Sequence, residues 1–113
     1  MKYHLITGGC GFVGRNFVKR LHSTTNDTIL FIDDLSVGTH PSTWLPEGTP
    51  SRSENGLEFF GEDERMIFLK QDARYFIREM LDDQEYIKKT YKLDVTSFED
   101  VFPPLLLVDI ANV

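Results

Sequence analysis

A glycine-rich segment near the start of the chain, TGGCGFVG from Thr7 to Gly14, constrains the fold more than any other feature. A short apolar run precedes it, and apolar residues at helical spacing follow it (Phe17, Val18 and Leu21). This order predicts a strand, a tight turn and a helix. Turns of this kind hold phosphates on backbone N–H groups at the positive end of the helix dipole. The segment therefore predicts a nucleotide-binding turn, with a purely structural glycine turn as the alternative.

Each of three glycines has a physical reason to stand where it does. Gly8 permits the tight turn after the strand, and Gly14 lets the helix pack closely against the sheet. Gly11 has no side chain, so the backbone can approach a pyrophosphate. Cys10 lies inside the same turn, where we expect a tolerated small residue and not a nucleophile.

A second apolar run, Thr28 to Ile32, has the β-branched composition of a strand and ends in Asp33 and Asp34. Its distance from the glycine turn is close to the about 20 residues that separate such a turn from a ribose-binding acid. A carboxylate here can accept hydrogen bonds from the ribose hydroxyls and would repel a 2′-phosphate, which favours NAD over NADP. We predict this role for Asp33; for Asp34, opening a turn is the simpler role.

Composition limits the classes of protein to which the chain can belong. With 113 residues, 41% of them hydrophobic and 27% charged, it suits one small globular domain. A net charge of −6 without a basic cluster argues against nucleic acid as a partner. No apolar stretch reaches the about 20 residues of a membrane span, and a single cysteine allows neither an internal disulfide nor a zinc cluster. A reducing cytoplasm fits this composition best.

The remaining pattern alternates strands with helices. We expect strands at 3–7, 28–33 and 66–70 and helices at 12–22, 74–81 and 84–91. The stretch 34–65 is expected to be a long irregular loop or insert, with one short helical turn around 42 to 45. This alternation predicts an α/β fold with a Rossmann-like, doubly wound parallel sheet of three to four strands, the N-terminal half of such a fold only.

The third expected strand ends at Asp72, on the same sheet edge as the glycine turn. Its carboxylate could accept a hydrogen bond from the amino group of adenine, and Ala73 could donate its backbone N–H. Capping the helix that follows is an equally weighted alternative for Asp72.

Three segments together resemble the extended short-chain dehydrogenase/reductase family: TGGCGFVG, FIDDLSVG (31–38) and FLKQDAR (68–74). Within that family the chain is similar to NAD-dependent nucleotide-sugar epimerases and dehydratases, over about residues 3–38 and 66–74. The resemblance implies that Gly8, Gly11, Phe12 and Gly14 hold the pyrophosphate and that Asp33 holds the ribose. It also implies that Leu35, Ser36 and Gly38 line the adenosine side and that Asp72 and Ala73 hold the adenine. Val13 and Asp34 complete the predicted cofactor-binding residues.

Two departures from the family pattern concern catalysis and the C-terminal part. The family's Tyr-x-x-x-Lys motif is missing, because none of the four tyrosines is followed by lysine four residues later. The fourth strand begins at Asp100 but meets Pro103-Pro104, which does not suit a central strand. The run Leu105–Leu107 is what the codons of the family's alanine-rich fourth strand would encode if they were read one base out of frame. We therefore expect 1–113 to be a partial NAD-binding Rossmann domain with an atypical tail at 103–113 and no catalytic residues.

Three functions follow from these expectations. The chain is the NAD-binding part of a nucleotide-sugar epimerase or dehydratase, inactive by itself; or a non-catalytic dinucleotide-binding or docking module; or a truncated or frameshifted product without activity. The expected partners are NAD, a nucleotide sugar implied by the family, and a dimer with itself or with a full-length relative. Neither nucleic acid, nor a membrane, nor a metal ion is expected.

Overall fold

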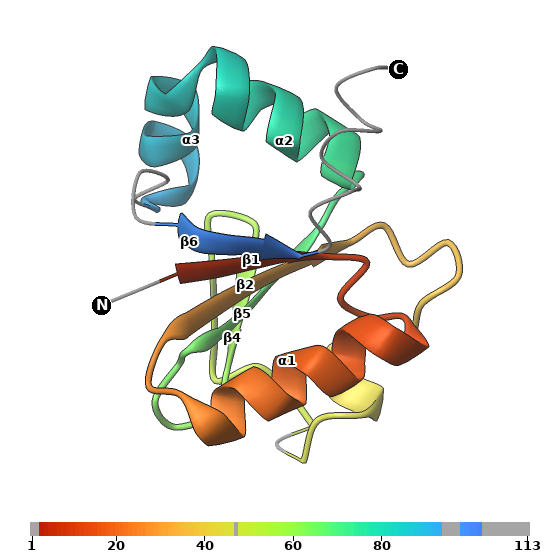
Figure 1. Ribbon diagram of the computed structural model, residues 1–113. Coiled ribbons are helices and arrows are strands. Elements are labelled where there is room, and N and C mark those ends of the chain that lie inside the picture. The colour runs from red at the N-terminus through yellow and green to blue at the C-terminus, as the bar shows by residue number, and fades with distance from the viewer. Residues whose placement is uncertain (1–2, 47, 94–97, 103–113) are drawn as a thin grey trace.

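A six-stranded mixed sheet forms the centre of the computed structural model, which describes residues 3–46, 48–93 and 98–102. The strands lie in the order β3-β4-β5-β2-β1-β6. In chain order the elements are β1 (Tyr3–Thr7), α1 (Phe12–Thr24), β2 (Thr28–Asp33), the 3-10 helix η1 (Pro41–Thr43), β3 (Arg52–Glu54), β4 (Leu57–Phe60), β5 (Met66–Lys70), α2 (Ala73–Asp82), α3 (Gln84–Tyr91) and β6 (Phe98–Phe102). Figure 1 shows α1 on one face of the sheet and α2 and α3 on the other.

Four neighbouring strands, β5, β2, β1 and β6, are parallel, as the alternation of strands and helices predicts. All six residues of β2 are buried, because helices cover both faces of the sheet at this strand. Side chains alternate between two cores: Leu30 and Ile32 face α2 and α3, whereas Ile29 and Phe31 face α1. The expected doubly wound α/β fold is confirmed.

The expectation of a loop without strands at 34–65 is wrong, because β3 and β4 form an antiparallel hairpin that adds to the edge of β5. Its turn is Asn55-Gly56, with φ of +56° and +83°, and this pair favours a tight hairpin. Leu57 and Phe60 of β4 are fully buried and anchor the hairpin. The helical turn expected near 42–45 is present as η1.

Strand β6 lies beside β1, and its last residue, Phe102, is paired with Ile6. Pro103-Pro104 follows directly in the sequence but lies outside the described residues, so the expectation that this pair does not suit a central strand stays a prediction. The expected atypical tail, 103–113, lies outside the described residues. With β3 and β4 added, the sheet has six strands where the sequence predicted three to four. In the part of the chain that the structure describes, no helix has the length and apolarity needed to cross a bilayer.

Arg65 lies directly before β5, at the end of the sheet opposite the glycine turn. It connects this part of the chain to the C-terminal end of α1 and to the loop between α1 and β2. Its Nη1 donates to the carbonyls of Thr25 (2.9 Å) and Asp27 (2.8 Å), and its Nη2 donates to the carbonyl of His22 (3.1 Å). Nε pairs with Asp63 at 2.9 Å. The guanidinium is mostly buried and satisfies carbonyls at and beyond the C-terminus of α1, where intrahelical donors run out.

Arg65→Ala is expected to lower the free energy of unfolding by about 2 kcal/mol, because three part-buried carbonyls lose a charged donor. Arg65→Lys is expected to recover only part of this loss, since an ammonium cannot reach the same carbonyls as a planar fork. Urea denaturation measures both variants. Lys19→Ala, on an exposed position of α1, is the control. An unfolding free energy equal to that of the control would contradict this role for Arg65.

Candidate functional site

The glycine-rich turn joins β1 to α1 and is tied to the end of β2. Gly8 has φ +66°, a conformation that side-chain-bearing residues rarely adopt. Its N–H and that of Gly9 donate to the carbonyl of Ile32, at 2.8 and 3.3 Å, and Gly11 N–H donates to the Gly8 carbonyl at 3.1 Å. The turn is therefore held by backbone bonds at the carboxyl edge of the parallel strands, where α/β proteins bind ligands.

The glycines of this turn differ in what requires them. A Cβ at Gly14 would lie 2.2 Å from the Gly8 carbonyl oxygen, and one at Gly9 would lie 2.5 Å from Phe31 Cβ. Packing inside the protein therefore demands glycine at both positions. At Gly11 φ is −76°, and a Cβ would lie 3.5 Å from the Gly8 oxygen, an ordinary contact. Nothing in the described part of the protein demands a glycine at position 11, so the space beside it is open to a ligand.

Helix α1 begins at this turn without a side-chain cap. Gly11 is the N-cap residue, and the first turn holds no acidic residue. By position, the N–H groups of Phe12, Val13 and Gly14 have no acceptor within the helix. They and the helix dipole offer partial positive charge, which suits a phosphate.

Asp33, the predicted ribose ligand, lies at the end of β2 with its carboxylate among backbone N–H groups. Oδ2 accepts from Cys10 N at 3.0 Å, and Oδ1 accepts from Leu35 N at 2.8 Å. The residue is 9% exposed. A Cβ at Gly38 would lie 2.9 Å from Asp33 Oδ2, so the loop after β2 also packs against this carboxylate. Asp33 therefore supports the glycine turn, a role that the sequence analysis did not identify.

Asp34 forms a turn at the start of the loop after β2, which is the simpler of the two roles considered for it. Oδ1 of Asp34 accepts from Ser36 N at 2.9 Å and from Ser36 Oγ at 2.7 Å. The Ser36 N–H holds the pKa of the exposed Asp34 carboxyl below its ordinary value, with a smaller contribution from the hydroxyl. Leu35 adopts φ +63° and packs against the core under α1. The predicted cofactor contacts of Asp34, Leu35, Ser36 and Gly38 stay predictions.

A cavity of about 250 Å³ brings three of these segments together. Its lining comes from the glycine turn, the end of β2 and the start of α2, and consists of Gly8, Ile32, Asp33, Asp34, Asp72, Ala73 and Arg74. Five of these residues were predicted from the sequence as cofactor contacts. The volume is below the about 300–1,000 Å³ of complete small-molecule sites, so the cavity suits part of a larger ligand.

Asp72 caps helix α2, as one of its two predicted roles requires. Its Oδ1 accepts from Arg74 N at 2.9 Å, and the Arg74 guanidinium pairs with both carboxylate oxygens. These bonds from the Arg74 side chain and backbone hold the pKa of the Asp72 carboxyl below its ordinary value. Arg74 was not predicted as a site residue; the only sequence signal was its position directly after Asp72-Ala73.

Cys10 points into the core beneath the turn. Burial raises the pKa of its thiol well above the ordinary value, and the nearby carboxylates of Asp33 and Glu58 raise it further. The raised pKa favours the protonated form of the thiol, which is the less reactive form. Among the described residues, no group of three or more His, Cys, Asp and Glu side chains is placed to hold a metal ion.

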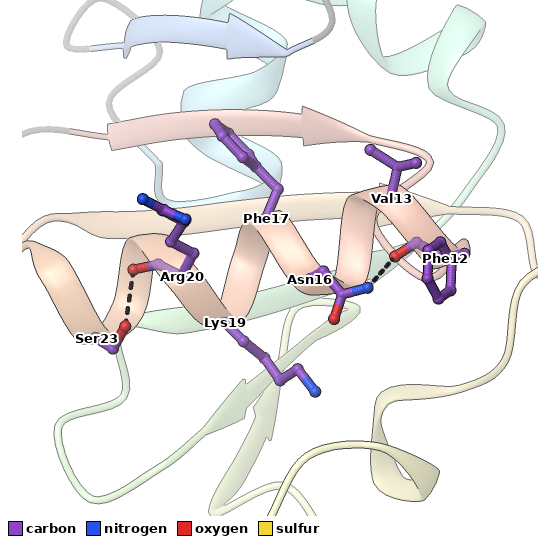
Figure 2. Close-up of a pocket in the computed structure, with 7 residues that line it drawn as sticks. All are labelled: Phe12, Val13, Asn16, Phe17, Lys19, Arg20 and Ser23. Atoms are coloured by element: carbon purple, nitrogen blue, oxygen red, sulfur yellow. Dashed lines mark hydrogen bonds between the residues drawn. The ribbon is translucent and has the colours of Figure 1, made fainter.

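A second hollow, of about 620 Å³, runs along the outer face of α1. Figure 2 shows its lining, which consists of Phe12, Val13, Asn16, Phe17, Lys19, Arg20 and Ser23. Phe12 is 73% exposed and Val13 64% exposed. Every lining residue belongs to one helix, and none carries a carboxylate or an imidazole. The hollow therefore offers an apolar surface with two cations and no group that accepts a proton at neutral pH.

Two alanine substitutions distinguish a glycine that internal packing requires, Gly14, from one beside which there is open space, Gly11. Gly14→Ala is expected to lower the free energy of unfolding by about 1–3 kcal/mol, because its Cβ would overlap the Gly8 carbonyl. Gly11→Ala is expected to lower it by less than about 1 kcal/mol, because alanine is a poorer N-cap residue than glycine but its Cβ meets only an ordinary contact. Thermal or urea unfolding compares the two. Equal destabilisation by both variants would contradict the assignment of open space to position 11.

No protein-family model matches the chain. The resemblance to short-chain dehydrogenases/reductases rests on the three sequence segments alone and stays a prediction.

Proposed function

We propose that this chain binds the adenosine diphosphate part of NAD at the edge formed by the glycine turn, the end of β2 and the start of α2. The observation that carries the proposal is the opening at Gly11, which packing alone does not explain. It lies in the turn that also supplies Gly8 to the cavity with Asp33. The uncapped start of α1 can bind a phosphate group through its free N–H groups. The carboxylates that line the cavity on the same edge can accept hydrogen bonds from the hydroxyls of a sugar.

Each part of the ligand has a chemically suited group. The backbone N–H groups of Phe12, Val13 and Gly14 would hold the pyrophosphate, and Asp33 would accept from the ribose hydroxyls. A carboxylate offers about four acceptor positions, and Asp33 uses one on each oxygen for the loop amides. Asp72 and the N–H of Ala73 would meet the amino group and a ring nitrogen of adenine.

The cavity also favours NAD over NADP. Three of its lining residues, Asp33, Asp34 and Asp72, are carboxylates, and Arg74 is the one cation among its seven lining residues. That cation is paired with Asp72 and is therefore partly neutralised. A 2′-phosphate at the ribose would approach like charges, which disfavours its binding.

The wider function we propose is that of the cofactor half of a nucleotide-sugar epimerase or dehydratase. NAD supplies the hydride acceptor in such chemistry. In the family, a tyrosine phenolate removes the sugar hydroxyl proton, and this sequence has no tyrosine followed four residues later by lysine. The chain by itself therefore provides cofactor contacts and no proton transfer.

Isothermal titration calorimetry with NAD and NADP tests the binding. NAD is expected to bind at least about tenfold more tightly than NADP, a difference of about 1.4 kcal/mol. Gly11→Ala is expected to weaken NAD binding at least about tenfold while the fold persists, because its methyl group would enter the pyrophosphate space. Ser23→Ala, near the other end of α1, is the control. Equal NAD affinity for Gly11→Ala and the unmodified chain would contradict the site.

Turnover is the second test of the proposed function. With NAD and a panel of uridine and thymidine diphosphate sugars, the chain alone is expected to give no epimer and no dehydrated product. Product analysis by liquid chromatography measures this, with Gly11→Ala as the background control. Conversion above that background would show that a different group in this chain transfers the proton.

A further inference from the structure

Two acids of the cavity lie at the ends of neighbouring parallel strands: Asp33 is the last residue of β2, and Asp72 comes two residues after β5. Their carboxylates accept different numbers of hydrogen bonds. Asp33 accepts one backbone N–H on each oxygen. Asp72 accepts from Arg74 N (2.9 Å) and Nε (3.1 Å) on Oδ1, and from Nε (3.2 Å) and Nη2 (2.7 Å) on Oδ2. These contacts involve three hydrogens, because the single hydrogen of Nε is shared between the two oxygens. Of the about four acceptor positions of a carboxylate, Arg74 therefore occupies about three on Asp72.

The adenine amino group is also a donor, so it competes with the guanidinium hydrogens of Arg74 for the acceptor positions of Asp72. The backbone bond from Arg74 N caps α2 and stays in place when the side chain moves. The guanidinium contacts are different, because the Arg74 side chain is 59% exposed and can turn into solvent. An exposed ion pair of this kind holds its partners weakly, so a ligand can displace it.

We propose that Arg74 competes with the amino group of adenine for the Asp72 carboxylate and thereby lowers the preference of the cavity for 6-aminopurines. Arg74 acts here as a specificity-determining residue, and this role rests on the proposed binding of NAD. The same guanidinium also adds positive charge to the cavity that it lines together with Gly8 of the glycine turn, which is proposed to hold the diphosphate. Its removal therefore weakens all dinucleotides alike and strengthens selectively those that donate to Asp72.

The ratio of two affinities separates these effects. NAD and nicotinamide hypoxanthine dinucleotide share the diphosphate and both riboses, but the second carries a 6-oxo group in place of the amino group. In Arg74→Ala, the ratio of NAD affinity to hypoxanthine dinucleotide affinity is expected to rise about two- to fivefold, the range that loss of an exposed ion pair allows. Arg78→Ala removes the same charge one helical turn later, at an exposed position, and should leave the ratio unchanged.

Calorimetry of the three proteins with both dinucleotides gives the ratio, and circular dichroism verifies that each is folded. An unchanged or lower ratio in Arg74→Ala, with NAD still bound by the unmodified chain, overturns the competition and leaves the proposed function in place. An equal rise in Arg78→Ala also overturns it, because charge alone would then explain the effect. Absence of saturable NAD binding to the unmodified chain overturns the proposed function and this inference together.

Discussion

The carboxylate of Asp33 is the constraint on which the sheet edge with the glycine turn depends. It accepts from Cys10 N in the glycine turn and from Leu35 N in the next loop, and so joins two segments that the chain separates by more than twenty residues. Hydrogen bonds from N–H groups to an ionised carboxylate are stronger than those between neutral groups, and this carboxylate is almost fully buried. The residue predicted to select the ribose is therefore also the one that keeps the turn in place.

The glycines surround this point because the backbone segments approach one another too closely for side chains. Gly38 lets the loop after β2 lie against Cys10 and Asp33, and Gly14 lets α1 lie against the carbonyl of Gly8. Close packing of the helix was the role predicted for Gly14 from the sequence, and the overlap of a Cβ there with the Gly8 carbonyl agrees with that role. Gly11 is different, since space beside it is open, and the ligand argument depends on that position.

Sequence reasoning located the elements whose side chains bury in a regular pattern. The strands at 3–7, 28–33 and 66–70 were predictable because their apolar runs lie between two covered faces. Strand β3 was not predictable in this way, since all three of its residues are polar and exposed; Asn55-Gly56 was the only signal of the hairpin. In the site, spacing from the glycine turn located Asp33, but a bond between a side chain and a distant backbone N–H leaves no sequence pattern.

Asp33 and Asp72, which lie at the same edge of the sheet, differ in how firmly their carboxylates are held. The partners of Asp33 are backbone N–H groups within packed turns, which cannot leave without opening the fold, so its geometry is set before any ligand arrives. Most of the contacts of Asp72 come from one exposed side chain, which can exchange with a ligand donor at little loss of stability. Substitutions near Asp33 should therefore change folding and binding together. Substitutions at Arg74 should leave folding almost unchanged, because its side chain is exposed. If this edge binds adenine as proposed, Arg74 is therefore the position where specificity can vary without loss of the fold.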